Sequence, residues 1–164
     1  MDKTSFVYVT YIRTTPEKLW EALIEPEFTR QFWAGTWQVS EWKAGSPWKI
    51  MIPDGRVADS GEVLEIDPCR RLVLSWRNEF RPELKPEGYS RLSYLLEQQG
   101  DMVKLTVTHE MAQPGSKFIE AVSQGWPMIL ASLKSLLETG QPLEATRRWR
   151  EGDKCVAEAT ASAH

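Results

Sequence analysis

Strict alternation of apolar and polar side chains in the second half of the chain limits its possible folds more than any other feature. Between residues 72 and 109, apolar or aromatic residues take every second position in three segments: Leu72, Leu74 and Trp76; Leu92, Tyr94 and Leu96; Val103, Leu105, Val107 and His109. A period of two places these side chains on one face of a strand and polar residues on the other. The pattern predicts an antiparallel sheet with one covered face and one wet face.

A helix is the predicted cover for the apolar face. Apolar residues recur at intervals of three and four, the spacing of one helix face, at Trp126, Ile129, Leu130, Leu133, Leu136 and Leu137. We expect this helix to span residues 126–138. Pro127 suits the first turn of a helix, so residues 117–123 are predicted to form a separate short helix or a kinked lead-in.

The first part of the chain predicts one strand followed by two short helices. Residues 6–12 are rich in β-branched and aromatic side chains, which favour a strand. Thr15 before Pro16 is typical of a helix N-terminus, and Pro26 ends this helix and starts another. Further strands are predicted at residues 37–42, 48–52, 57–66, 72–77, 90–97 and 103–110.

These elements define an α+β domain. We predict a curved antiparallel sheet of six or seven strands wrapped around a long C-terminal helix, with two short helices after the first strand. Gly140 and Pro142 set the domain boundary at residue 140, so the domain covers residues 1–140. Residues 141–164 show little hydrophobic periodicity and are expected to form a flexible tail.

The composition and charge of the chain limit the classes of function and partner that we expect. The 164 residues include 8 Trp but only 2 His, which favours binding over proton-transfer or metal chemistry. A net charge of −3 argues against nucleic acid as a partner. Cys69 and Cys155 have neither zinc-site nor disulfide-framework spacing, and no segment resembles a signal peptide or a membrane span. We therefore expect a cytoplasmic protein without membrane insertion, metal or other cofactor.

Three segments carry a resemblance to a known superfamily. They are residues 15–23 (TPEKLWEAL), residues 61–72 (GEVLEIDPCRRL), and Gly125-Trp126 followed by Leu130, Leu133 and Leu137. Together they resemble the SRPBCC or START-like helix-grip superfamily, and within it the family named after the activator of the heat-shock-protein-ninety ATPase. The resemblance covers roughly residues 6 to 139 and implies a cavity between sheet and C-terminal helix.

The resemblance leaves several functions open, because this fold supports many. We expect a carrier or sensor for a small apolar or aromatic ligand. The alternatives are a cavity enzyme of the polyketide cyclase or aromatase type, and a co-chaperone-like interaction module. The eukaryotic co-chaperone has an additional N-terminal chaperone-binding domain, whereas this sequence begins directly at the expected helix-grip domain, so the co-chaperone role is the less expected one. A weak homodimer is a further expectation.

Seven residues are candidates for the ligand cavity, because indole and phenol rings supply flat apolar walls with a polar handle. They are Trp33, Trp48, Trp76, Tyr94, His109, Trp126 and Leu130. The alternative for the Trp residues is ordinary core packing, and for His109 a structural role with hydrogen bonds to the backbone. No residue is assigned as catalytic.

The charged residues of the middle strands are interpreted as solvated edge charges that discourage pairing with other strands. This group comprises Arg56, Asp59, Glu62, Arg77, Glu79 and Arg81. The tail motif Arg147-Arg148-Trp149-Arg150 is short and lies in a charge-balanced segment, so it is weak evidence for an interaction site.

Overall fold

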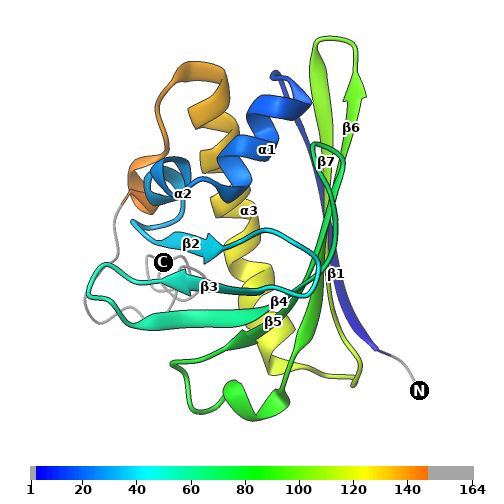
Figure 1. The fold of residues 1–164 in the computed structure, drawn as a ribbon, viewed down its shortest axis with the longest axis vertical. Coiled ribbons are helices and arrows are strands. Elements are labelled where there is room, and N and C mark those ends of the chain that lie inside the picture. Colours follow the sequence, from blue (N-terminus) through cyan, green and yellow to red (C-terminus); the bar gives the residue numbers. More distant parts are fainter. Residues whose placement is uncertain (1–2, 148–164) are drawn as a thin grey trace.

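The computed structural model describes residues 3–147. One antiparallel sheet of seven strands has the order β1-β7-β6-β5-β4-β3-β2 (Figure 1). The strands are β1 (Thr4–Ile12), β2 (Trp37–Ser40), β3 (Pro47–Met51), β4 (Val57–Asp67), β5 (Arg71–Asn78), β6 (Ser90–Gln99) and β7 (Met102–Met111). The predicted α+β class, the number of strands and their antiparallel arrangement are confirmed.

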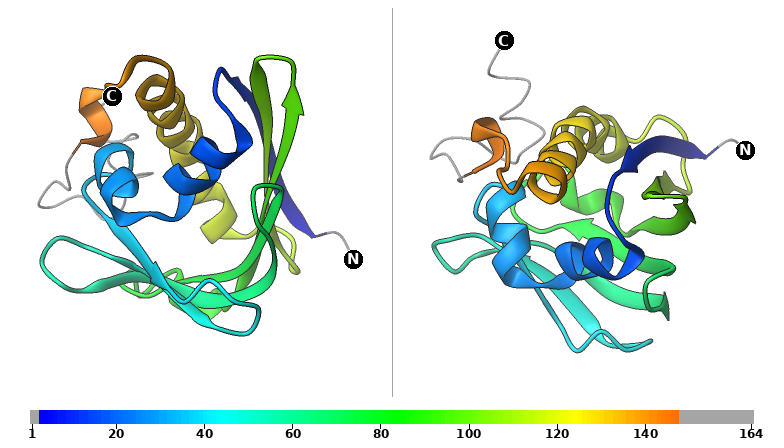
Figure 2. Two further views of the ribbon diagram at one scale, coloured as in Figure 1. Left: turned by 45° about the horizontal axis from the view of Figure 1, so that its top comes forward. Right: turned by 90° about the horizontal axis from the view of Figure 1, so that it is seen from above.

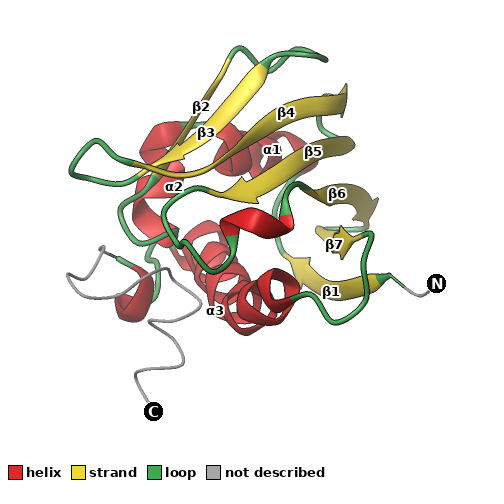
Figure 3. Ribbon diagram, turned by 90° about the horizontal axis from the view of Figure 1, so that it is seen from below, coloured by secondary structure: helices red, strands yellow, loops and turns green. Residues whose placement is uncertain are grey.

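The helices lie together on the concave side of the sheet. They are α1 (Pro16–Ile24), α2 (Pro26–Phe32) and α3 (Lys117–Thr139). Figure 2 shows the strands curling around these helices, and Figure 3 shows all three on one side of the sheet. The fold is therefore the predicted helix grip.

Local sequence signals set the two short helices. The Thr15 side chain accepts a hydrogen bond from the backbone N–H of Lys18, which satisfies one of the free donors at the start of α1. Pro16 and Pro26 occupy the first positions of α1 and α2, where a proline removes no helix hydrogen bond. The prediction of two helices divided at Pro26 is confirmed.

The alternating strands bury the predicted face. Burial in β7 alternates along its whole length, and Val103, Leu105, Val107 and His109 are fully buried. In β6 the buried positions include Tyr94, whose ring packs edge-on against Trp126 of α3. This helix–sheet seam is the centre of the hydrophobic core.

Helix α3 differs from the prediction of a separate lead-in before Pro127. It is one helix from Lys117 to Thr139 that contains Pro127 in its interior. A proline there leaves the carbonyl of Ser123 without its usual helix partner and typically costs about 3 kcal/mol. Burial of Phe118 and Ile119 before the proline and of Ile129 after it keeps both parts of the helix on the core.

The segment after α3 is also packed, in contrast to the expectation of a flexible tail from residue 141. A short 3-10 helix, η2 (Glu144–Thr146), places the fully buried Thr146 against the domain. The Thr146 hydroxyl bonds to that of Ser132 at 2.6 Å, and its carbonyl accepts from the Ala34 N–H at 2.7 Å. Residues 148–164, and with them most of the Arg-Trp motif, lie outside the described residues.

Candidate functional site

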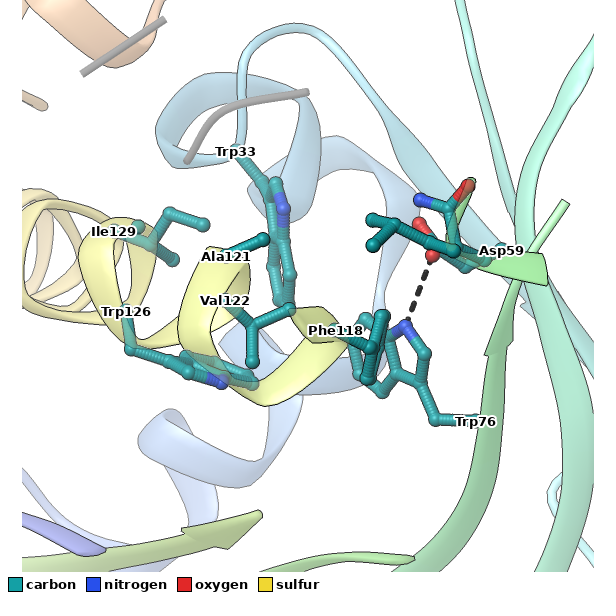
Figure 4. A pocket seen from close by; sticks show the side chains of 11 residues that line it. Trp33, Asp59, Trp76, Phe118, Ala121, Val122, Trp126 and Ile129 are labelled. Carbon is teal, nitrogen blue, oxygen red and sulfur yellow. Dashed lines mark hydrogen bonds between the residues drawn. The ribbon is translucent and has the colours of Figure 1, made fainter. Parts of the chain in front are cut away.

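A pocket lies between the N-terminal half of α3 and the β4–β5 part of the sheet (Figure 4). Its volume is about 60 Å³, and part of its surface is open to solvent. It is lined by Trp33, Asp59, Trp76, Asn78, Leu84, Phe118, Ala121, Val122, Gly125, Trp126 and Ile129. Three of the predicted cavity residues, Trp33, Trp76 and Trp126, are thus brought together at one site.

These three indoles form a connected aromatic wall. Trp33 stacks on Trp76 with ring centroids 5.9 Å apart and meets Trp126 edge-on at 5.3 Å. Trp76 and Trp126 are also in edge-on contact, at 5.9 Å. The rings are almost completely buried, so they fill much of the space between helix and sheet, and the pocket of about 60 Å³ lies beside them.

Asp59 supplies the carboxyl group of the pocket. It lies on β4, where it pairs with Asn78 of β5 and Ile50 of β3, and its Oδ1 accepts a hydrogen bond of 3.0 Å from Nε1 of Trp76 (Figure 4). The pKa of Asp59 is raised to about 7: burial and the charge of Glu79 raise it, and the hydrogen bonds from Trp76 and Asn78 offset part of that rise. The interpretation of Asp59 as a solvated edge charge is therefore wrong: the carboxyl faces the aromatic wall.

Glu79, by contrast, is surrounded by donors. Burial alone would raise its pKa, but hydrogen bonds from Arg77, Ser60 and Lys85 together lower the pKa of Glu79 to about 2. The Arg77 Nε lies 2.8 Å from Glu79 Oε2, and the Lys85 Nζ lies 3.2 Å from Oε1. Arg77 and Lys85 therefore both pair with Glu79, and among residues 3–147 Asp59 forms no ion pair.

His109 does not line the pocket, and both of its ring nitrogens take part in a series of hydrogen bonds. Nε1 of Trp126 donates to its Nδ1 at 3.1 Å, so Nε2 carries the proton and donates to the Ser90 hydroxyl at 2.8 Å. The Ser90 hydroxyl in turn donates to the carbonyl of Trp76. Burial lowers the pKa of His109 to about 3, so the ring is neutral and both nitrogens are occupied. Its partners are side chains rather than the backbone groups considered from the sequence.

The remaining predicted residues lie outside the pocket lining as well. The Trp48 indole donates to the carbonyl of Ser75 at 2.8 Å and packs edge-on against Trp76. Leu130 is buried in the seam. The Tyr94 hydroxyl is buried and has no hydrogen-bond partner among the described residues, and burial raises its pKa.

Sequence reasoning missed several lining residues, although a signal existed for some of them. On β5, Asn78 is the next residue after Leu74 and Trp76 in the series of every second, inward-facing position. On β4, Asp59 lies an even number of positions before the fully buried Val63, so both are expected on the same face. Extending both patterns to the strand ends would have placed the two polar side chains on the inner face. Phe118 and Val122 precede Trp126 at intervals of four, which is a helical signal for the inner face, whereas Leu84 lies in a segment without periodicity and no signal indicated it.

Metal ligation and membrane insertion find no support in residues 3–147. No group of three His, Cys, Asp or Glu side chains in this range is arranged to hold a metal ion. Within the same range, every helix is too short or too polar to cross a membrane.

A curved antiparallel sheet gripping a C-terminal helix, with a pocket between them, defines a helix-grip domain of the START-like superfamily. The model of the family described as activator of Hsp90 ATPase homolog 1-like protein matches residues 13–138, and the chain belongs to this family. A comparison with curated protein sequences finds none that matches.

Solved structures share the fold. A protein of Cytophaga hutchinsonii is 28% identical with a TM-score of 0.68, and the match covers 85% of this chain and 98% of that one. A protein of Mesorhizobium loti is 23% identical with a TM-score of 0.69, covering 82% and 97%. The Aha1 dimer from Colwellia psychrerythraea is 20% identical with a TM-score of 0.68, covering 84% and 98%.

Proposed function

We propose that this chain is a binding protein for a small, mainly apolar ligand that enters the pocket beside Trp33, Trp76 and Trp126. The observation that carries the proposal is the combination of aromatic walls with two polar side chains, Asp59 and Asn78, in a pocket that is partly open to solvent. Apolar walls provide burial, and a few convergent polar groups orient the ligand.

The size of the pocket limits the ligand. A volume of about 60 Å³ is well below the roughly 150 Å³ of a cavity that accepts benzene. A sterol or a polycyclic aromatic compound would need the indoles to move apart. The ligand is therefore small, or inserts one small end and leaves the rest outside.

The proposal favours binding over catalysis. The ring nitrogens of His109 are both occupied, and its pKa of about 3 makes it a poor base near neutral pH. Asp59 is the one acidic or basic residue among the described residues that line this pocket, and its pKa of about 7 lies near neutral pH. A reaction in this pocket would have to use Asp59 as its acid or base.

A screen by thermal shift and tryptophan fluorescence tests the proposal. Short-chain alcohols, amines, acids and small aromatic compounds are compared with fatty acids, sterols and flavonoids, and each hit is incubated to look for turnover. Ala121→Leu fills the pocket and should abolish binding. Ala131→Leu makes the same change at an exposed position of α3 and should leave binding intact. Binding that survives Ala121→Leu would place the ligand elsewhere and refute the proposal.

A second candidate is self-association as an interaction module, favoured by exposed apolar side chains on edge strand β1. Val7, Val9 and Tyr11 are 57%, 43% and 43% exposed and share the outer face of the strand. The Aha1 protein of Colwellia psychrerythraea, which shares this fold, is a dimer. Sedimentation of the wild type and Val9→Lys tests this candidate: a weak dimer that the lysine disrupts supports it, and a monomer at high concentration excludes it.

A further inference from the structure

Asp59 is a half-buried acid that has no cationic partner in the described part of the chain. Its carboxyl accepts hydrogen bonds from the Trp76 indole and the Asn78 side chain, and no Lys or Arg among residues 3–147 pairs with it. A carboxylate taken out of water without a positive partner is costly, and proteins normally supply that partner. Arg77 and Lys85 instead form ion pairs with Glu79, the acid on the adjoining segment.

The other walls of the pocket are suited to a positive charge. Indole rings attract cations through the negative face of the ring, and tryptophan is the strongest of the aromatic side chains in this role. Three indoles and the ring of Phe118 line the same space as the Asp59 carboxyl. Figure 4 shows the hydrogen bond between Asp59 and Trp76, with Trp33 and Phe118 among the other side chains that line the same pocket.

We propose that the ligand is a small organic cation, and that its ammonium group lies among Trp33, Trp76 and Phe118 with the Asp59 carboxylate as counter-ion. The inference rests on the proposed ligand-binding function and names the chemical class of its ligand. The volume of about 60 Å³ suits an ammonium head group with small alkyl substituents better than a fused ring system. The open side of the pocket leaves room for the rest of the molecule.

Binding of a cation should be coupled to the ionisation of Asp59. The side chains around Asp59 on the neighbouring elements are uncharged. They are Ile50 of β3, Asn78 of β5, Trp33 after α2, and Phe118, Ala121 and Val122 of α3. Glu79 is the nearby acid, already paired with Arg77 and Lys85, and Arg81 pairs with Glu83. A cation that binds in this pocket is therefore expected to favour the ionised carboxylate of Asp59, so that binding is accompanied by release of the Asp59 proton.

The pH dependence follows with a definite sign. The free protein holds Asp59 half-protonated at about pH 7, because its pKa lies there, and a cationic ligand favours the ionised form. Affinity for the cation should rise with pH through about 7 and level off above it. Below that point the affinity should fall by up to about tenfold per pH unit.

Matched cationic and neutral probes test the inference. Butylammonium is compared with 1-butanol, and choline with its uncharged carbon analogue 3,3-dimethyl-1-butanol, by calorimetry and tryptophan fluorescence at about pH 5.5, 7 and 8. We expect each cation to bind at least about tenfold more tightly than its neutral analogue at pH 8. Asp59→Asn keeps the acceptor for Trp76 and should abolish both this preference and its pH dependence. Glu62→Gln removes an exposed carboxylate from the same strand and should change neither.

The outcomes separate this inference from the proposed function. If the neutral analogues bind as tightly as the cations, or if Asp59→Asn leaves the cation preference unchanged, the organic-cation inference is overturned while apolar binding in the pocket stands. If neither cations nor neutral compounds bind, and the Ala121→Leu variant behaves like the wild type, both are overturned. The probe pairs decide the question on the wild-type protein even if a variant fails to fold.

Discussion

Replacing Asp59 by Asn should change the pH dependence of stability in the way expected for a half-buried carboxyl that has no cationic partner among residues 3–147. An acid whose pKa is raised by folding contributes stability that is fully present below its unfolded pKa and lost as the pH rises through its folded pKa. For Asp59 these pKa values are 3.8 and about 7. The wild type therefore loses this contribution between about pH 4 and pH 7, and the Asn variant, which never ionises, does not.

The magnitude follows from the difference between the two pKa values. A rise from 3.8 to about 7 corresponds to at most about 4 kcal/mol. The pocket is partly open, so water and salt screen the carboxylate, and we expect about 2 kcal/mol. Relative to the wild type, Asp59→Asn should be near neutral at pH 4 and more stable by about 2 kcal/mol at pH 8.

The test must compare the free energy of unfolding of the variant with that of the wild type, because His109 changes the stability of both proteins in the opposite direction over the same pH range. Folding lowers the pKa of His109 from 6.5 to about 3, so the unfolded chain binds the extra proton and stability rises with pH over that interval. Urea denaturation at several pH values, on the wild type, Asp59→Asn and the control Glu62→Gln, cancels the His109 contribution. A difference between Asp59→Asn and the wild type that does not vary with pH would refute the reasoning.

Four further changes test the packing. Leu133→Ala should lower the free energy of unfolding by about 2–5 kcal/mol, because it opens a cavity in the helix–sheet seam, and denaturant unfolding measures this. Gly61→Ala should cost more than about 3 kcal/mol or prevent folding, because its Cβ would lie 1.8 Å from the carbonyl oxygen of Ser75; far-ultraviolet circular dichroism would reveal the loss. Tyr94→Phe should be neutral or stabilise by up to about 2 kcal/mol in thermal unfolding, because the hydroxyl has no partner among the described residues, and a marked loss would indicate an ordered water there. A chain that ends at residue 142 should melt several degrees below one that ends at 147, because it loses the hydrogen bonds of Thr146, and equal melting temperatures would contradict this packing.

Local periodicity was enough to predict the architecture of this protein. Alternation in β6 and β7 and the three-and-four spacing from Trp126 to Leu137 depend only on which face a side chain takes along a regular backbone. Capping by Thr15 and the prolines at positions 16 and 26 are equally local. For this reason the sheet and the gripping helix could be inferred from the sequence pattern, whereas the superfamily was inferred from the resemblance of three segments.

Other features of the chain depended on energies that no local pattern contains. Helix α3 continues through Pro127 because burial on both sides of it outweighs the lost hydrogen bond, and the chain after residue 140 packs because Thr146 finds Ser132 and Ala34 in space. Both outcomes are set by contacts between residues distant along the chain.

The site was decided at the tertiary level. The sequence predicted that Trp33, Trp76 and Trp126 would face inward, but the curvature of the sheet decided that they pack on one another with a small pocket beside them. The register of β4 against β5 placed Asp59 beside Asn78 and Trp76, while Arg77 and Lys85 were drawn to Glu79. Whether a carboxyl is solvated or buried without a cation depends on this three-dimensional distribution of partners, because electrostatic interactions act through space rather than along the sequence.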